Sequence, residues 1–205
     1  TYSRGGFLGL CAVLLVLILR SRKKLLGIAA MSLGVILFLN FGPQAYLERI
    51  QSIKNYEEDD SAMGRIYAWR VAMAMIKERP LTGVGLRNFV QMYPIYDPIH
   101  APKVAHNSYL QLAAETGLVS LSLFLLLLAS AIFKLKKIRR KIKFNLSTAW
   151  IHNYSRMIEI GLIGYIVTAF FLTRHDFDLL YQFVGLTVAL EHIAKKEKLI
   201  PEYAK

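Results

Sequence analysis

The 205-residue sequence contains a single cysteine, and its acidic residues are far fewer than its basic ones. Cys11 alone cannot form a disulfide within the chain or build a cysteine-based metal site. Asp and Glu number 14 against 26 Lys and Arg, which gives a formal net charge of +12. Such an excess can serve nucleic acid binding, but no recognised nucleic-acid-binding motif accompanies it, so we expect no nucleic acid partner.

Apolar residues, in contrast, make up 55% of the chain and fall into blocks of about bilayer length. We therefore predict an all-α fold, a polytopic transmembrane helix bundle. Because the chain opens on Thr1 directly at an apolar segment, we expect it to be the C-terminal part of a longer protein. The predicted organisation is two transmembrane helices in 1–42, a long, mostly helical periplasmic loop in 43–116, a transmembrane helix in 117–134, a basic cytoplasmic loop in 135–156, two transmembrane helices in 157–195 and a cytoplasmic tail in 196–205.

Three basic clusters give the orientation. They read RSRKK from Arg20, KLKKIRRKIK from Lys134 and KKEK from Lys195. Two predicted spans separate each cluster from the next, so all three are predicted on one side of the membrane. The excess of Lys and Arg in cytoplasmic loops makes that side the cytoplasm.

A helix is predicted in the external section, within EEDDSAMGRIYAWRVAMAMIKERP. Asp60 or Ser61 can cap its start, and Pro80 ends it. Apolar side chains recur at helical spacing and predict its packed face: Ile66, Trp69, Met73 and Ile76.

Arg65 falls in the first turn of that helix, where the helix dipole disfavours a cation. An arginine is tolerated there if it is exposed or if an anion shares the site. Two interpretations stay open. Arg65 either pairs with Glu58 or Asp59, or joins the helix N-terminus in binding a phosphate.

His106 stands in the stretch KVAHNSYLQLAAETGL. Ser108 and Gln111 fit the capping-box pattern, so a helix is predicted to start at Ser108. His106 then lies just outside the positive end of the dipole, which disfavours the imidazolium ion. A neutral imidazole can serve as a general base, whereas the alternative is a histidine that only hydrogen-bonds its loop. Asp97, His100 and His106 match no standard zinc spacing, so no metal is expected.

Arg4, in YSRGG, lies at the external end of the first predicted span. An arginine there either extends to the lipid head groups or meets an anion. Arg4, Arg65 and His106 are all predicted on the same side of the membrane. A cationic site beside a neutral base suits a lipid-linked diphosphate donor and a hydroxyl acceptor.

The chain resembles the O-antigen ligase and O-antigen polymerase superfamily of bacterial envelope enzymes. The stretches that carry the resemblance are SRGG (3–6), GRIYAWRVAMAMIKERPLTGVGLRNF (64–89) and HNSYLQLAAETGLVSLSLF (106–124). The RHDFD turn and the shape of the external loop are most similar to the branch of O-glycosylation ligases. No motif assigns a role to Arg174, His175, Asp176 or Asp178.

The resemblance implies an enzyme of the bacterial inner membrane with its active site facing the periplasm. It would transfer glycan from undecaprenyl diphosphate to an acceptor hydroxyl of a lipid, protein or glycan, with inversion and without a metal or other cofactor. Carried over by motif, His106 would be the catalytic base. Arg65, of the G-R-x-x-x-W motif, and Arg4, of the S-R-G motif, would bind the diphosphate.

Three alternatives remain beside the ligase. A polymerase of the same superfamily would use a repeat unit as acceptor. A non-enzymatic transporter of lipid-linked glycan should carry charged or broken segments near mid-bilayer, whereas the predicted spans hold only Glu159 and Glu191, near their cytoplasmic ends. A non-catalytic scaffold would require no convergence of Arg4, Arg65 and His106.

Overall fold

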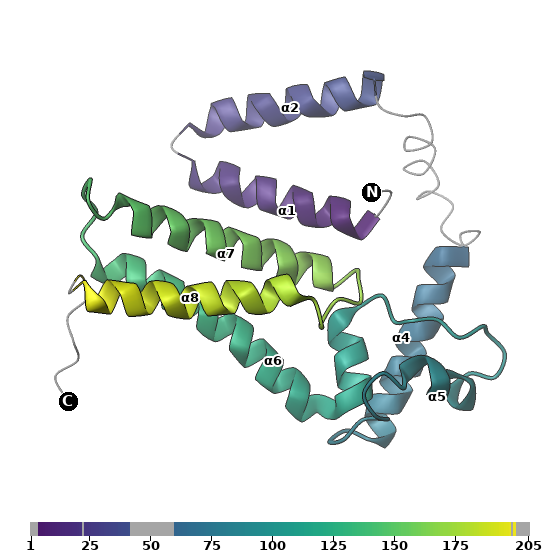
Figure 1. Ribbon diagram of the computed structural model, residues 1–205. Helices are drawn as coiled ribbons and strands as arrows, with labels where there is room; N and C mark the ends of the chain where they lie inside the picture. Colours follow the sequence, from purple (N-terminus) through teal and green to yellow (C-terminus); the bar gives the residue numbers. More distant parts are fainter. Residues whose placement is uncertain (1–3, 22, 42–59, 198, 200–205) are drawn as a thin grey trace.

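The computed structural model of the chain describes residues 4–21, 23–41, 60–197 and 199 (Figure 1). All regular structure in these ranges is helical, as the all-α prediction requires. The helices are α1 (Arg4–Arg20), α2 (Lys24–Phe41), α4 (Asp60–Glu78), α5 (Phe89–Tyr96), α6 (Ser108–Lys141), α7 (Ala149–Ala169) and α8 (Asp178–Lys196).

Helices α1, α2, α6, α7 and α8 are neighbours, and α4 and α5 lie at one end of them (Figure 1). Gly9 of α1 lies against Thr168 near the end of α7, and Val13 lies against Gly164, so α1 and α7 are antiparallel. Glycine at these two positions lets the helix backbones approach closely. Between α6, α7 and α8 lies an apolar core that includes Leu128, Leu135, Ile151, Leu162, Leu180 and Leu190.

A second, smaller core joins α4 and α5 to the start of α6. Its members include Ala68, Ala72, Met75, Phe89, Tyr93, Ala113 and Ala114. The predicted packed face of α4 was therefore only partly right, because Ile76 is buried but Met73 is 56% exposed. The buried face of α4 consists of Ala68, Val71, Ala72, Met75 and Ile76, and its small side chains lie against Ala113 and Ala114 of α6.

Helix α6 contains a sharp bend at Gly117 (Figure 1). Gly117 has φ 85° and ψ 170°, a backbone conformation that is essentially restricted to glycine. The loop that follows α4 fills the break: the Val84 and Gly85 N–H groups donate to the carbonyls of Ala114 and Glu115, each at 2.9 Å. In return, the Leu118 N–H donates to the carbonyl of Pro80 at 2.7 Å. The loop and the bend therefore satisfy each other's backbone groups.

The segment predicted as a basic loop, 135–156, is largely helical. Helix α6 continues to Lys141 and α7 begins at Ala149. Leu135 and Ile138 are buried in the main core. The α6 helix extends through the basic cluster because its apolar residues recur at helical spacing and give that cluster a packed face.

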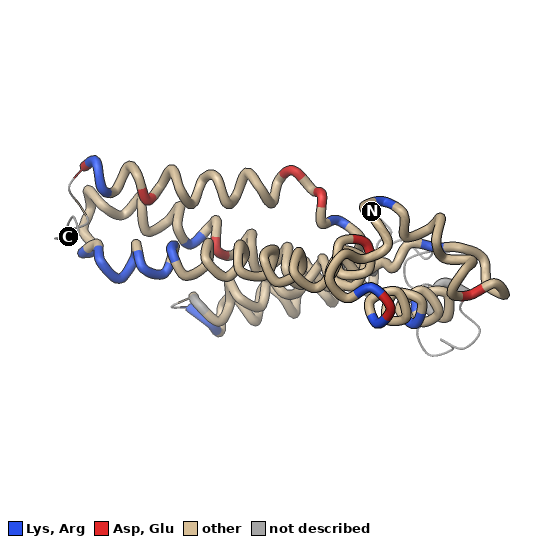
Figure 2. Tube along the Cα trace, turned by 90° about the horizontal axis from the view of Figure 1, so that it is seen from below, with Lys and Arg blue, Asp and Glu red and all other residues tan. Residues whose placement is uncertain are grey.

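Lys and Arg gather where α6 and α8 end and where α2 begins (Figure 2). The two acidic residues of the predicted spans are paired at this end. Glu191 lies 3.3 Å from Lys134 and 3.0 Å from Lys195, and the fully buried Glu159 carboxylate contacts the Arg139 guanidinium. Neither carboxylate is therefore left as an unpaired charge in an apolar helix, which would be costly.

Within the described residues, α6 is the one helix that is long and apolar enough by itself to cross a membrane. Leu8–Leu19 and Lys24–Phe38 are shorter apolar helical stretches. Their large apolar side chains lie largely on the surface, with Leu10 54% and Leu33 56% exposed. Exposed apolar surface of this extent is typical of contact with lipid or with further protein.

We predict that Gly117→Ala destabilises the protein by more than about 2 kcal/mol, because an L-residue is strained at positive φ and overpacks its surroundings. A Cβ there would lie 2.1 Å from the Leu81 carbonyl oxygen. Thermal unfolding in detergent measures the effect. Gly185→Ala in α8 is the control, since nothing lies within 4 Å of its Cβ position. An unchanged unfolding midpoint for Gly117→Ala would contradict the role given to the bend.

Candidate active site

His106 lies in the last part of the loop between α5 and α6. Its φ of 47° places it in the left-handed region, just before the helix. Helix α6 begins at Ser108, as predicted, but its cap is Asn107, whose Oδ1 accepts from the Tyr109 and Leu110 N–H groups at 3.0 Å each. The capping-box prediction was therefore wrong. The Ser108 hydroxyl instead donates to the Leu172 carbonyl oxygen at 2.6 Å.

The backbone on the N-terminal side of His106 is also fixed. The buried Ala105 carbonyl accepts from the indole Nε1 of Trp69, on α4, at 2.7 Å. Its N–H donates to Oε1 of Gln111 at 3.1 Å. Hydrogen bonds to Ala105 and Asn107 therefore hold the chain on both sides of His106, which limits where the imidazole can point.

Arg65 belongs to the first turns of α4. Its Nε is buried and has no hydrogen-bond partner among the described residues. A buried unpaired donor is unfavourable, so this atom is suited to an anion. Glu58 and Asp59, the partners that the sequence offered it, lie outside the described residues.

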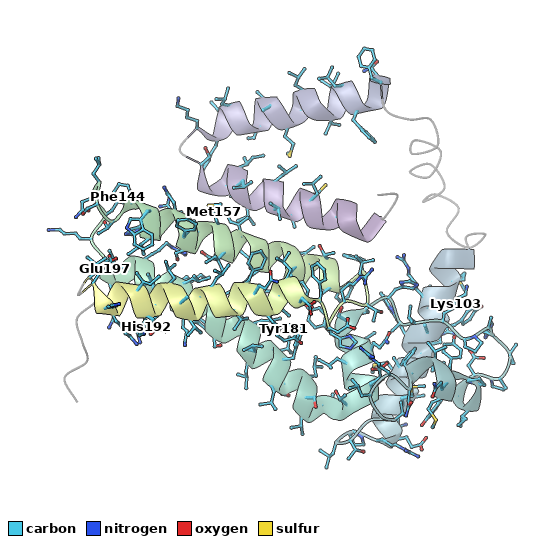
Figure 3. All side chains as sticks on the ribbon, viewed as in Figure 1. Lys103, Phe144, Met157, Tyr181, His192 and Glu197 are labelled. Carbon is cyan, nitrogen blue, oxygen red and sulfur yellow. The ribbon has the colours of Figure 1, made fainter. Side chains whose placement is uncertain are left out.

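Lys103 joins this group, and sequence reasoning missed it. Its side chain crosses the backbone of Gly64, where an added Cβ would lie 2.6 Å from Nζ and 3.0 Å from Cδ. Figure 3 shows Lys103 beside α4. The sequence pattern does not predict this contact. It depends on the loop that carries Lys103 folding back over Gly64, which has no side chain, in the first turns of α4.

Burial, followed by the positive charges of Arg65 and Lys103, lowers the pKa of His106 from its ordinary value. All three causes act in the same direction, since each disfavours the imidazolium ion. The position of His106 before the N-terminus of α6 adds to them. Burial first, and then the two nearby cations, therefore favour the neutral form of His106.

Arg4 is the first residue of α1, and its side chain lies outside the described part of the chain. Because α1 is antiparallel to α7, the start of α1 lies at the end of the bundle where α7 finishes (Figure 1). The start of α6 is at the same end, since Ser108 contacts Leu172. The structure thus brings Arg65 and His106 together and leaves the side chain of Arg4 undescribed.

Asp97 and His100 form a separate pair. Asp97 Oδ2 lies 2.8 Å from His100 Nδ1, and the imidazole stacks on the ring of Tyr67 at 3.7 Å between centroids. In the described part of the chain, no three His, Cys, Asp or Glu side chains gather as metal ligands would. The Asp97–His100 pair instead holds the proline-containing loop against α4.

The turn between α7 and α8 packs against the start of α6. The Arg174 N–H donates to the Ser108 hydroxyl at 2.8 Å, and Arg87 lies 4.0 Å from Asp176. Nδ1 of His175 is buried and has no hydrogen-bond partner among the described residues. The RHDFD turn therefore borders the candidate site, which the sequence alone could not show.

Residues 1–125, more than half of the chain, match the family model described as O-Antigen ligase, Wzy_C. The chain belongs to this O-antigen ligase family. No curated protein and no solved structure matches it. Membership points to membrane glycosyl transfer of the ligase or polymerase type. The matched segment includes Arg4, Arg65, Lys103 and His106 but ends before α7, so it does not cover the RHDFD turn.

We predict that Lys103→Gln raises the pKa of His106 toward the ordinary imidazole value of about 6.5, because one of the two nearby positive charges is removed. Nuclear magnetic resonance of histidine-labelled protein across a pH series would measure this. Lys103→Arg keeps the charge and should leave the titration in place, as should Lys77→Gln at the exposed end of α4. If the His106 titration is the same in Lys103→Gln as in the unmodified protein, Lys103 does not act on the imidazole.

Proposed function

We propose that the protein is a membrane glycan ligase that transfers glycan from undecaprenyl diphosphate to an acceptor hydroxyl, with inversion and without a metal. The observation that carries the proposal is a neutral imidazole beside a guanidinium whose buried Nε has no partner in the described part of the chain. The first group can take a proton and the second can bind an anion. Family membership supplies the class of reaction.

In the proposed reaction the acceptor hydroxyl oxygen attacks the anomeric carbon of the donor while His106 takes the hydroxyl proton. The bond between that carbon and the diphosphate oxygen breaks, and undecaprenyl diphosphate leaves with the electron pair. Arg65 binds the diphosphate through its planar donors, Lys103 adds a second charge, and Arg4 contributes a third cation from the start of α1. Stabilising the charge that develops on the leaving group lowers the barrier to transfer.

An apolar groove supports a polyprenyl donor. It lies between α6 and α7, has a volume of about 510 Å³, and its lining includes Tyr109, Leu125 and Phe171. Tyr109 is only three residues after His106, so the groove starts close to the candidate base. A long isoprenoid chain in this groove would bury apolar surface and bring its diphosphate to the cationic end.

The proposal places α1, α2, α6, α7 and α8 in the bacterial inner membrane as a multi-pass bundle. The end that carries the basic clusters would face the cytoplasm, in accord with the positive-inside rule, and the site would face the periplasm. Glu159 and Glu191 pair with basic residues near that end and so do not line a path at mid-bilayer. This favours an enzyme over a transporter. A polymerase would use the same chemistry with a different acceptor.

We predict that His106→Ala inserts normally but loses glycan transfer by about a hundredfold or more, because a general base is removed. The assay uses the complete protein in liposomes with undecaprenyl-diphosphate-linked glycan and candidate acceptors. His192→Ala, an exposed histidine at the opposite end of α8, is the matched control and should stay active (Figure 3). Full transfer by His106→Ala at matched expression would refute the base assignment.

We also predict that Arg65→Lys lowers transfer by about tenfold or more, since an ammonium cannot replace a planar fork of donors. The loss should be largest at low donor concentration, because the lost contact is to the diphosphate. Arg79→Lys serves as control, as Arg79 is 49% exposed and pairs only loosely with Glu78 at 3.6 Å. Equal donor dependence in Arg65→Lys and the unmodified protein would argue against diphosphate binding.

A further inference from the structure

Gln111 is a buried amide, 7% exposed, one turn into α6, and both of its ends are used. Its Oε1 accepts from the Ala105 N–H and from the Thr173 hydroxyl, each at 3.1 Å. Its Nε2 donates to Oε1 of Glu115 at 2.9 Å. One side chain thus joins the loop before His106, the turn between α7 and α8, and the carboxylate beside the bend of α6.

Glu115 fixes which way the amide faces. Its carboxylate is 1% exposed and accepts at Oε2 from the Arg87 N–H at 2.9 Å. A carboxylate only accepts hydrogen bonds, so the NH₂ group of Gln111 must face it and the carbonyl oxygen must face Ala105. The Ala105 N–H is buried, and without that oxygen it would lose its partner at a cost.

We infer that Gln111 is a positioning residue for His106. This inference rests on the proposed function, in which His106 is the base. Gln111 acts through the backbone N–H of Ala105, the residue immediately before His106. It therefore has no need to touch the reacting atoms. The indole of Trp69 donates to the carbonyl of Ala105, in the next peptide group. The amide and the indole therefore hold the two peptide groups that flank Ala105, and they fix the direction in which the chain enters the left-handed turn at His106.

The hydrogen bond from Thr173 connects the C-terminal part of the chain to Gln111. Thr173 lies in the turn between α7 and α8, beyond the residues that match the family. Its hydroxyl shares the Gln111 oxygen with the Ala105 N–H. The Gln111 oxygen therefore links this turn to the residue that precedes His106.

Three variants test the inference. Gln111→Leu keeps a side chain of similar size but removes both the hydrogen-bond acceptor and the hydrogen-bond donor of the amide. Gln111→Glu keeps the acceptors but sets a carboxylate against Glu115, so the two share a proton and one pKa is raised. Gln111→Glu combined with Glu115→Gln exchanges the two groups. All four hydrogen bonds described above can then form again, with the amide at 115 donating to the carboxylate at 111 and accepting from the Arg87 N–H.

Transfer is measured in the complete protein in liposomes, with undecaprenyl-diphosphate-linked glycan as donor. We expect Gln111→Leu to lower kcat by about tenfold to a hundredfold while the KM for donor changes little, because misplacing a base affects the chemical step. Gln111→Glu should lose activity as pH rises through the raised carboxylate pKa, which adds an alkaline limb to the pH profile. The exchanged pair should remove that limb and recover most of kcat.

Amide hydrogen exchange of the peptide that contains Ala105 gives a readout without activity. Exchange should be faster in Gln111→Leu and return toward the unmodified rate in the exchanged pair. Gln91→Glu, at an exposed position of α5, is the charge control and should change neither exchange nor pH profile. The exchanged pair keeps the test decisive even if Gln111→Leu does not fold.

The two proposals fail in different ways. If His106→Ala is fully active, the base assignment fails whatever Gln111 does. If His106→Ala is inactive and Gln111→Leu keeps the kcat and pH profile of the unmodified protein, the positioning role is overturned and the base assignment stands. Failure of the exchanged pair to recover kcat, in a protein that folds, also overturns the positioning role.

Discussion

The bend at Gly117 is the constraint on which the rest of the site depends. A straight helix of 34 residues would be about 50 Å long and would carry its N-terminus away from α4. The bend turns the first segment of α6 against α4, and the loop after Pro80 secures it by supplying the backbone partners that the break removes. His106, just before α6, and Arg65, in the first turns of α4, become neighbours because of this one change in direction.

The electrostatics of the site follow from that geometry. Burial of the His106 imidazole, the charges of Arg65 and Lys103, and the N-terminus of α6 all favour the neutral ring. The same cations favour an incoming anion. In the proposed function, the negative charge of a bound diphosphate would oppose the effect of Arg65 and Lys103 on His106 and would make the imidazole a better proton acceptor. In the proposed reaction, the same cations therefore favour a neutral imidazole before the donor binds and attract the donor itself.

The sequence patterns correctly predicted the features that are determined by residues close together in the chain. The all-helical class, the end of α4 before Pro80 and the start of α6 at Ser108 follow from composition, proline and capping residues. The cap itself was missed because Asn107 and Ser108 are both good caps, and the Leu172 carbonyl, 64 residues away, takes the Ser108 hydroxyl. The position of Lys103 over Gly64 was missed for the same reason, since long-range packing leaves no periodic signal.

The two ends of the molecule hold their positive charge in different ways. At the end with the basic clusters, Glu159 and Glu191 pair with cations, and further basic side chains such as Lys136 and Arg140 are exposed. At the other end, the Glu115 carboxylate accepts from the neutral Arg87 N–H and the Gln111 amide. An acidic group that made an ion pair with Arg65 would compete with a diphosphate. Among the described residues no carboxylate takes the Arg65 Nε, which fits the anion-binding role proposed for it.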